Sequence, residues 1–402
     1  MESILAYDGF WLTARVKEKR GRMSGEAINL FVPTFRVEEC LAEIRKCLEV
    51  GWTGLGFKTV EFEEAWKAYT GLPHAHFLNS ATAGLHLAIK LLKETKQWSD
   101  GDEVITTPIT FVSTNHSILY EGLKAVFADT DDYGCLDPSS IEERITSRTR
   151  AVLFVGLGGS VGQYEKIRDI CRDRKLALIV DAAHLTGSRV KHQTACSDAD
   201  VLIYSFQAVK NLPTSDSGMI CFQDGTLDSM ARQQSWLGID KDTYSRTFSG
   251  GTYKWYYEVP HLGYKYHGNA LTAAVALVQL RYVDADNAYR RQIAGWYDSF
   301  FANSNKVAPI PVPPGCESSR HLYQVLVSKR DEAILALNSA KIYPGVHYRD
   351  NTEYDMYAYA KGTCPRAREF SETVLSLPIH MRMTHKDVER VAATLVDLAG
   401  RG

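Results

Sequence analysis

The sequence predicts an α/β protein in which a large domain, built on a mostly parallel sheet, precedes a small C-terminal α+β domain. Two observations lead to this prediction. Short apolar segments alternate with helical segments between about residues 100 and 222, and this order changes in the C-terminal part of the chain. Strands that alternate with helices form crossover connections, which place parallel strands side by side and cover both faces of the sheet.

Six apolar segments are expected as strands of the large domain. They are EVIT (103–106), AVFA (125–128), AVLFV (151–155), LALIV (176–180), VLIYS (201–205) and GMICF (218–222). The segments TNHSILYEG, PSSIEERI and YEKIRDICRDR lie between them and are expected as helices. We therefore assign residues 29–285 to the large domain, after an N-terminal extension of residues 1–28 that lacks clear periodicity.

The C-terminal part of the chain has its own pattern. A long helical stretch at about 269–303 leads out of the large domain. Beyond it, LYQVLVS (322–328) is expected as a strand, DEAILALNSA as a helix, and about 385–399 as the final helix, with Thr384 and Asp387 spaced as a capping box. We assign residues 286–402 to the small domain.

The composition is that of a soluble protein. The chain has 402 residues, 45% of them hydrophobic and 23% charged, and its formal net charge is -2, which gives no electrostatic basis for binding nucleic acid or an anionic membrane. No apolar run approaches the roughly 20 residues that a membrane span requires, and no secretory signal is recognised. The eight cysteines form no CxxC pair or metal-binding cluster, so reduced thiols, no metal and a cytoplasmic protein are expected.

Three segments near expected strand ends carry groups suited to one cofactor. Asp181 ends an apolar strand and is followed by His184; Ser205 ends the next strand, five residues before Lys210; and residues 80–82 precede an apolar helix. Ligands bind beyond the carboxyl ends of strands in open parallel sheets. Each group alone is typical of a turn, a cap or a solvated loop. Together they match pyridoxal phosphate, which needs a lysine for its Schiff base, an acid opposite the pyridine nitrogen, and a helix N-terminus for its phosphate.

From about residue 29 onward the chain resembles the DegT/DnrJ/EryC1/StrS family of sugar aminotransferases, which are fold type I pyridoxal-phosphate enzymes. The segments that carry the resemblance are GWTGLGFKTVEFEEAW (51–66), NSATAGLHLA (79–88), TPITFVSTNHSILYEGLKAVFAD (107–129), VDAAHLTGS (180–188), SFQAVKNL (205–212), LGYKYHGNALTAAVALVQL (262–280), GVHYRD (345–350) and LSLPIH (375–380).

The resemblance implies roles for individual residues around the cofactor. Lys210 matches the Schiff-base lysine, Asp181 the acid that pairs with the ring nitrogen, and His184 a residue near the ring's 3-oxygen. Ala81, Thr82 and Ser205 match the positions that bind the phosphate. Phe111 matches the aromatic residue that stacks on the pyridine ring. Pyridoxal phosphate, with its pyridoxamine form as the intermediate, is the cofactor that the resemblance implies.

The resemblance also implies a homodimer with shared sites, in which the GYxY segment of one subunit reaches the cofactor of the other. Lys265, His267 or Asn269 is expected to complete that site, and His347 and Tyr348 in the GVHY segment are expected near the substrate. The implied reaction transfers an amino group from glutamate to a nucleotide-linked keto sugar, most simply a nucleoside diphosphate 4-keto-6-deoxyhexose. The cations and rings of three segments, residues 253–257, 264–267 and 347–349, are expected to help bind the nucleotide.

The chain departs from the family pattern at three places. Asp216 and Ser217 replace a glutamate and a glycine after the lysine loop, and Lys265 stands where family members often have asparagine. Gly156 replaces a histidine after the central strand, so we expect more room in the substrate pocket. This room would admit a different keto sugar or a 3-keto isomer. A keto-inositol is the alternative acceptor, because enzymes of the family that the chain resembles aminate cyclitols.

Other functions fit the residues less well. Dehydratases on the same scaffold carry histidine at the lysine position, and Lys210 argues against them. A paralogue that binds the cofactor without turnover is opposed by the presence of Lys210, Asp181 and His184. An NAD-binding protein is opposed because no GxGxxG follows a first strand.

Overall fold

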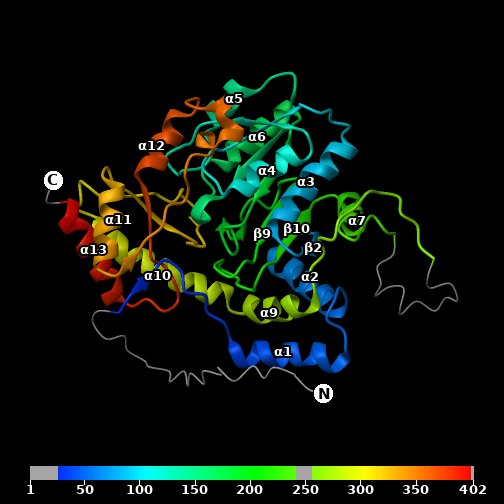
Figure 1. Cartoon of the computed structure of the whole chain (residues 1–402), viewed down its shortest axis with the longest axis horizontal. Helices are drawn as coiled ribbons and strands as arrows, with labels where there is room; N and C mark the ends of the chain where they lie inside the picture. Colours follow the sequence, from blue (N-terminus) through cyan, green and yellow to red (C-terminus); the bar gives the residue numbers. More distant parts are fainter. Residues whose placement is uncertain (1–25, 241–255, 400–402) are drawn as a thin grey trace, which may run out of the picture.

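The computed structural model describes residues 26–240 and 256–399, so most of the predicted N-terminal extension lies outside the described residues. Figure 1 shows the helices α1 (Val37–Val50), α9 (Ala270–Leu280) and α2 (Phe57–Thr70) below the main sheet, and the C-terminal helices to one side. Among the described residues, no helix has both the length and the apolar character needed to cross a membrane.

The main sheet has seven strands in the order β2-β10-β9-β6-β5-β3-β4. The strands in chain order are β2 (His74–Leu78), β3 (Glu103–Thr106), β4 (Lys124–Phe127), β5 (Thr149–Val155), β6 (Ala177–Asp181), β9 (Val201–Ser205) and β10 (Gly218–Phe222). The five strands from β9 to β4 are parallel, whereas β10 runs antiparallel to both β9 and β2. The predicted α/β class and the mostly parallel sheet are therefore confirmed, and all six predicted strands form.

Crossover helices connect the parallel strands. They are α3 (Ala81–Thr95), α4 (Val112–Tyr120), α5 (Pro138–Arg144) and α6 (Tyr164–Arg174), and α7 (Gly225–Gln234) follows the last strand of the sheet. Helix α3 packs on strands β2, β10, β9 and β6, and α6 packs on β5 and β6. Strands β3, β6 and β9 are buried along their whole length, as expected for a sheet covered on both faces.

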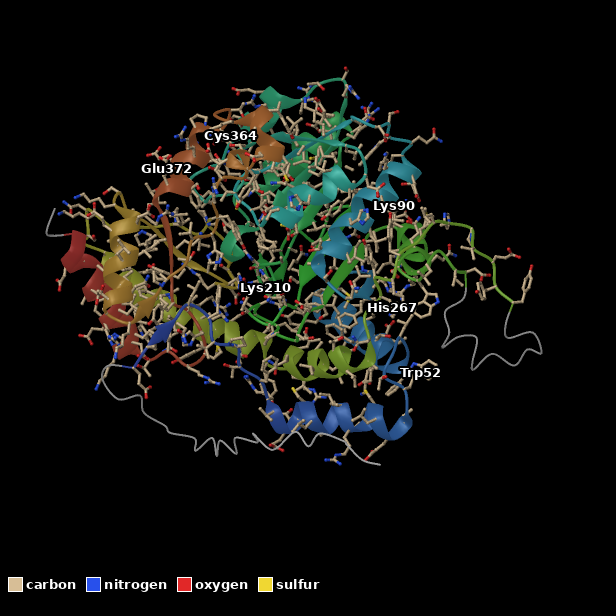
Figure 2. The ribbon with its side chains drawn as sticks, in the orientation of Figure 1. Trp52, Lys90, Lys210, His267, Cys364 and Glu372 are labelled. Atoms are coloured by element: carbon tan, nitrogen blue, oxygen red, sulfur yellow. The ribbon has the colours of Figure 1, made fainter. Side chains whose placement is uncertain are left out.

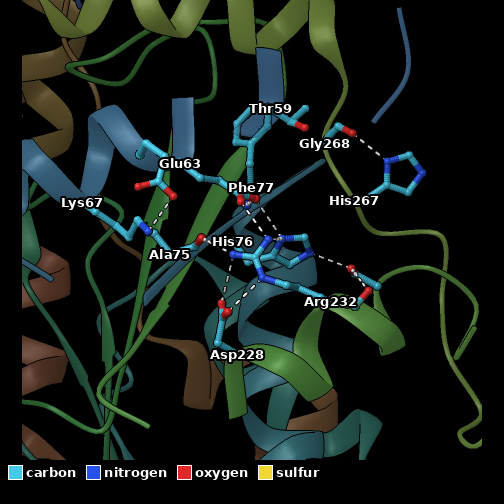
Figure 3. A network of polar contacts seen from close by, with 12 residues as sticks. Thr59, Glu63, Lys67, Ala75, His76, Phe77, Asp228, Arg232, His267 and Gly268 are labelled. Atoms are coloured by element: carbon cyan, nitrogen blue, oxygen red, sulfur yellow. Dashed lines mark hydrogen bonds and ion pairs between the residues drawn. The ribbon is translucent and has the colours of Figure 1, made fainter. Parts of the chain in front are cut away.

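Strand β2 was not predicted, and a buried polar network explains its position at the edge of the sheet. The carboxylate of Glu63 on α2 accepts hydrogen bonds from the Phe77 N–H at 2.8 Å and from Arg232 on α7 at 2.8 Å, and it lies 3.0 Å from His76 (Figure 3). Arg232 also binds Asp228 and the carbonyl of Ala75. The network joins α2, β2 and α7, so the edge strand is held by long-range contacts that local sequence does not reveal.

The C-terminal region forms a second core. Its strands are β11 (Ala308–Pro309), β13 (Tyr323–Leu326) and β15 (Val374–Leu377), which make one sheet, and β14 (Ile342–Tyr343), which pairs with β1 (Ile28–Asn29). The helices α10 (Val283–Phe301), α11 (Arg330–Ser339) and α13 (His385–Ala399) pack in this core, whereas α12 (Pro365–Thr373) packs on the core of the main sheet. The predicted capping box forms, since the Asp387 N–H donates to the Thr384 hydroxyl and the Asp387 carboxylate accepts from the Thr384 N–H. A third small sheet joins β12 (Cys316–Glu317), β7 (Arg189–Val190) and β8 (Gln193–Thr194).

The two cores interleave along the chain. Ile28 is buried in the C-terminal core with Ile293 and Tyr297 of α10, whereas Tyr357 and Phe370 are buried in the core of the main sheet. Residues 345–360 therefore lie beside the carboxyl ends of the parallel strands, where Asn351 donates to the carbonyl of Thr110. The assignment of 29–285 and 286–402 to two domains stays a prediction about folding units.

Candidate active site

A cavity of about 460 Å³ opens at the carboxyl ends of the parallel strands. Most of the residues singled out in the sequence line it together. They are Ala81, Thr82, Phe111, Asp181, His184, Ser205, Lys210, His347 and Tyr348. Figure 2 shows Lys210 near the middle of the molecule, whereas His267 lies on the side of α2 and α7. The fold thus brings side chains from five separate parts of the sequence to one cavity.

Asp181 is the last residue of β6, and its carboxylate is buried. The hydroxyl of Thr114 on α4 donates to Oδ2 at 2.7 Å, and the Ala183 N–H donates to Oδ1 at 3.0 Å. Burial raises the pKa of Asp181, and the two hydrogen bonds and the positive charge of Lys210 oppose that shift. Thr114, which the sequence analysis did not single out, therefore orients the carboxylate.

Lys210 lies in the loop between β9 and β10, half-buried against the cavity. Desolvation lowers the pKa of its amine to about 8, and the negative charge of Asp181 acts in the opposite direction. An amine with this pKa is present in both protonation states near neutral pH. Such an amine can act as a nucleophile and can both accept and release a proton.

An anion site is formed by the start of α3. Ser80 is the N-cap and accepts from the Ala83 N–H at 3.1 Å, which leaves the first N–H groups of the helix, at Ala81 and Thr82, facing the cavity. Ser205 ends the neighbouring strand β9 and contributes a hydroxyl. A Cβ at Gly218 would lie 2.7 Å from the Ala81 nitrogen, so only glycine lets α3 approach the sheet this closely.

His184 is buried three residues beyond Asp181. Its Nδ1 accepts a hydrogen bond from the Gly158 N–H at 3.2 Å, and its Nε2 lies 3.3 Å from the Tyr348 hydroxyl. Burial lowers the pKa of His184 well below its usual range, and the charge of Lys210 adds to this. The imidazole is therefore neutral.

Phe111 precedes α4 at the mouth of the cavity and exposes 60% of its side chain. Its ring is tilted against that of Tyr348, with the ring centroids 6.2 Å apart. A phenylalanine this exposed in the lining of a cavity has an apolar face free to stack on a planar ligand.

His347 and Tyr348 come from the C-terminal region. Nδ1 of His347 lies 2.9 Å from the Ser376 hydroxyl, and its backbone carbonyl accepts from Gln324. Burial, together with the positive charge of Lys210, lowers the pKa of His347 to about 4. Burial raises the pKa of the Tyr348 hydroxyl, with Asp181 adding to the effect. Both side chains are therefore neutral hydrogen-bonding groups.

Lys265 and Asn269 do not line the cavity of their own chain. Lys265 is exposed, with Nζ 3.2 Å from the centre of the Trp236 ring, and Asn269 is the N-cap of α9. His267 also lies away from the cavity, with Nδ1 bound to the Gly268 carbonyl. Their expected part in the site of a second subunit stays a prediction.

The expectation of extra room at Gly156 is wrong. A Cβ at this position would lie 2.4 Å from Cγ of Leu185, so the leucine already fills the space that a side chain at 156 would take. Leu185 is buried in the core of the main sheet. The glycine is thus a packing requirement, and it does not enlarge the pocket.

Two residues that the sequence analysis missed, His321 and Phe31, also line the cavity. Phe31 comes before the strands of the main sheet in the chain, and His321 comes after them. Neither lies in a recognisable motif, and only the packing of the C-terminal region brings them to the site. Asp216 and Ser217, noted as departures from a family pattern, lie in the lining as well.

The donor groups of the cavity fit pyridoxal phosphate. A buried carboxylate, a lysine with a lowered pKa and an open helix N-terminus face one space, and these are the groups that bind its ring nitrogen, aldehyde and phosphate. The fold and the site together define a fold type I pyridoxal-phosphate protein.

Comparisons with known proteins agree with this class. The model of the DegT/DnrJ/EryC1/StrS aminotransferase family matches residues 35–396. The spore coat polysaccharide biosynthesis protein SpsC of Bacillus subtilis is 34% identical over 373 residues, which cover 90% of this chain and 94% of SpsC. The aminotransferase TlmJ from Streptoalloteichus hindustanus has a similar crystal structure, with a TM-score of 0.86 at 30% identity, covering 94% of this chain and 100% of TlmJ. Spr1654 from Streptococcus pneumoniae has been solved in a PLP form (27% identity, TM-score 0.85) that covers 94% of this chain and 99% of that protein.

The chain belongs to the DegT/DnrJ/EryC1/StrS aminotransferase family, a family of sugar aminotransferases. It is a pyridoxal-phosphate-dependent aminotransferase with the type I fold.

Proposed function

We propose that this aminotransferase moves an amino group from glutamate to a nucleotide-linked keto sugar, a 4-keto-6-deoxyhexose, and so makes an amino sugar. The observation that carries the proposal is that Lys210 and Asp181 face one cavity with the open N-terminus of α3. The hydroxyl and imidazole groups that line the rest of this cavity, including His347, Tyr348 and His321, suit a substrate rich in hydroxyl groups.

Lys210 and Asp181 carry the chemistry in this proposal. When bound, pyridoxal phosphate supplies a conjugated ring that takes up the electrons released as the Cα–H bond breaks. Asp181, ionised and oriented by Thr114, holds the proton of the ring nitrogen. Lys210 would hold the cofactor through Nζ, and its free amine would take the proton from one carbon and return it to the other.

The other lining residues bind and orient. The N–H groups of Ala81 and Thr82, with the hydroxyl of Ser205, bind the phosphate. Phe111 would stack on the cofactor ring, and the neutral imidazole of His184 would hydrogen-bond the ring's 3-oxygen. His347 and Tyr348 contact the substrate from the C-terminal side of the cavity.

We further propose a homodimer in the cytoplasm, in which Lys265, His267 or Asn269 completes the site of the other subunit. Exposed apolar side chains near this segment support a subunit interface there; they are Leu237, Tyr256, Tyr257, Val259 and Leu262. Of the residues expected to bind the nucleotide, 253–255 lie outside the described residues. All eight cysteines are free thiols, which supports a reducing compartment.

The experiment converts the protein to its pyridoxamine form with glutamate and then offers UDP-, GDP- and dTDP-linked 4-keto-6-deoxyhexoses beside scyllo-inosose. Return of the pyridoxal absorbance with a nucleotide sugar alone supports the proposal. Return with the inositol alone makes the chain a cyclitol aminotransferase. No conversion by glutamate or by any other amino acid points to the paralogue without turnover.

A further inference from the structure

Two imidazoles face each other inside the active-site cavity. The rings of His184 and His321 have centroids 4.2 Å apart and planes at 35°, and both side chains are buried and line the cavity. Phe31 also stacks on His321, with centroids 5.5 Å apart and planes at 12°. The His321 ring therefore packs against two aromatic neighbours.

The hydrogen position on His184 is dictated by the backbone. The Gly158 N–H lies 3.2 Å from Nδ1, and a backbone N–H can only donate. Nδ1 must therefore be the unprotonated nitrogen, and in the neutral ring the hydrogen lies on Nε2. That nitrogen points to the Tyr348 hydroxyl at 3.3 Å. His184 thus presents a donor to its neighbour.

On His321, in contrast, the hydrogen lies on Nδ1, and the hydrogen bonds of Asn211 dictate this. Nδ2 of Asn211 donates to the backbone carbonyl of Ser319 at 2.8 Å, and a carbonyl can only accept. The amide orientation of Asn211 is therefore known, and its Oδ1 is the atom 2.9 Å from Nδ1 of His321. Nδ1 must carry the hydrogen, which leaves a lone pair on Nε2.

A second anchor holds Asn211 in place. The other hydrogen of its Nδ2 goes to Oδ1 of Asn287 at 2.7 Å, and Nδ2 of Asn287 donates to the Thr186 carbonyl at 2.9 Å. The amide of each of these two asparagines is therefore oriented by a backbone carbonyl, which can only accept. Turning the Asn211 amide over would place its oxygen against two acceptors, at a cost of several lost hydrogen bonds.

The charges around His321 favour the neutral ring. Burial lowers the pKa of His321 well below its usual range, and the positive charges of Lys210 and Arg290 lower it further. In the neutral ring, with its hydrogen on Nδ1, Nε2 is unprotonated. Because Nδ1 is bound to Asn211, Nε2 is the nitrogen left to meet a ligand.

On the basis of the proposed function, we propose that His321 determines specificity for the ketone substrate, by accepting a hydrogen bond at Nε2 from one of its hydroxyl groups. Asn211 is the positioning residue that keeps this nitrogen unprotonated. The carboxylates of an amino-acid donor have only lone pairs to offer, so Nε2 makes no hydrogen bond with them. A polyhydroxylated ketone carries hydroxyl hydrogens. His321 thus favours the ketone over the amino-acid donor, although both substrates bind in the same cavity.

Two variants separate the nitrogen that meets the substrate from the one that binds Asn211. His321→Asn keeps a polar atom near the Nδ1 position and loses the acceptor at Nε2. His321→Gln places an amide near the Nε2 position, where its oxygen can accept from a hydroxyl. Single-turnover reactions of the cofactor-loaded enzyme are followed by absorbance, with glutamate for the first half and dTDP-4-keto-6-deoxyglucose for the second, or with whichever nucleotide-linked ketone or scyllo-inosose the wild-type protein accepts.

We expect the glutamate half-reaction to change by less than about twofold in both variants. In His321→Asn the specificity constant for the ketone should fall about tenfold, which is the worth of one hydrogen bond of about 1.4 kcal/mol, and His321→Gln should recover most of it. Equal losses in both half-reactions, or no loss in His321→Asn, overturn the inference while the proposed function stands. Failure of every ketone with wild-type protein, with glutamate still reacting, overturns the proposed substrate and its hydroxyl partner together.

The tautomer has a readout of its own. In the holoenzyme labelled with ¹⁵N-histidine, the resonances of His321 are identified by their loss in His321→Asn. We expect one neutral tautomer with the hydrogen on Nδ1, and the opposite tautomer for His184. In Asn211→Ala, checked for its melting temperature, the single tautomer of His321 should give way to a mixture. A hydrogen on Nε2 of His321 in the wild-type protein refutes the proposal whatever the kinetics.

Discussion

Asp181 and Lys210 act on each other across the active-site cavity. Burial lowers the pKa of the Lys210 amine to about 8, while the negative charge of Asp181 opposes that shift. In return, the positive charge of Lys210 opposes the rise that burial causes in the pKa of Asp181. Each charge therefore offsets part of the pKa shift that burial causes in the other group.

The first prediction follows from the position of Lys210. The protein with bound pyridoxal phosphate should absorb visible light, and Lys210→Ala should lose that band because no other lysine of the described residues lines the cavity of its own chain. Lys329→Ala, which alters an exposed lysine of the C-terminal region, is the matched control and should keep the band. A visible band that survives in Lys210→Ala would move the attachment to another residue.

The second prediction concerns pH. Only the neutral amine attacks an aldehyde, so the rate at which cofactor-free protein takes up pyridoxal phosphate should rise with pH and level off above about 8. An unperturbed lysine would still be gaining rate near pH 10. Asp181→Asn removes a charge that raises the pKa of Lys210, so the midpoint should move to lower pH. A midpoint that stays in place in Asp181→Asn would contradict the coupling.

The third prediction concerns rate. Asp181→Asn should keep the fold but slow transamination by about a hundredfold or more, because a charged partner of the ring nitrogen is worth about 3 kcal/mol of barrier. Thr114→Val removes only the hydrogen bond that orients the carboxylate, so it should have a smaller effect. Rates are compared at saturating glutamate, with melting temperatures measured for each variant. Wild-type rates in Asp181→Asn would remove this residue from the reaction.

The fourth prediction concerns packing beside the site. Gly156→Ala should destabilise the protein by about 1–3 kcal/mol, because its new methyl group would overlap the Leu185 side chain. Gly295→Ala on α10 is the control. Its methyl group meets no other atom, and alanine is the better helix former, so a gain of about 0.5–1 kcal/mol is expected. The free energies come from denaturant unfolding, and an unchanged Gly156→Ala would show that Leu185 moves aside freely.

The fifth prediction concerns assembly. Leu262 exposes 81% of its side chain beside the segment proposed to reach the second subunit. Leu262→Glu should place a charge in the interface, so the dimer should dissociate and activity should fall with it. Leu335→Glu on α11 changes an equally exposed leucine, 68% of it accessible, and should leave the dimer intact. Sedimentation and activity at nanomolar concentration test both variants, and a fully active wild-type monomer would refute the shared site.

Local sequence was sufficient for the elements that carry the main chemistry. Asp181, Ser205 and Lys210 were found because each follows a buried strand, and the carboxyl ends of parallel strands meet at one edge of the sheet. The helix that begins at Ala81 was found because small polar residues precede an apolar stretch. These features depend on hydrophobic periodicity and on short-range capping, both of which a single segment contains.

Long-range packing decided the rest. Strand β2 depends on Glu63, His76 and Arg232, which lie far apart in the chain and meet only in the folded protein. The space at Gly156 depends on Leu185, which no pattern around residue 156 reveals.

The sequence by itself determined the fold class, the cofactor and the lysine that faces it, because these follow from the order of strands and from residues at their ends. The tertiary structure alone decided that His321 enters the cavity and which of its nitrogens meets the substrate. That nitrogen is set by Asn211, whose amide is oriented by the carbonyl of Ser319, and these contacts join segments more than a hundred residues apart. A hydrogen-bond direction of this kind exists only once the partners are in place, since each group in the chain is constrained by the one beside it.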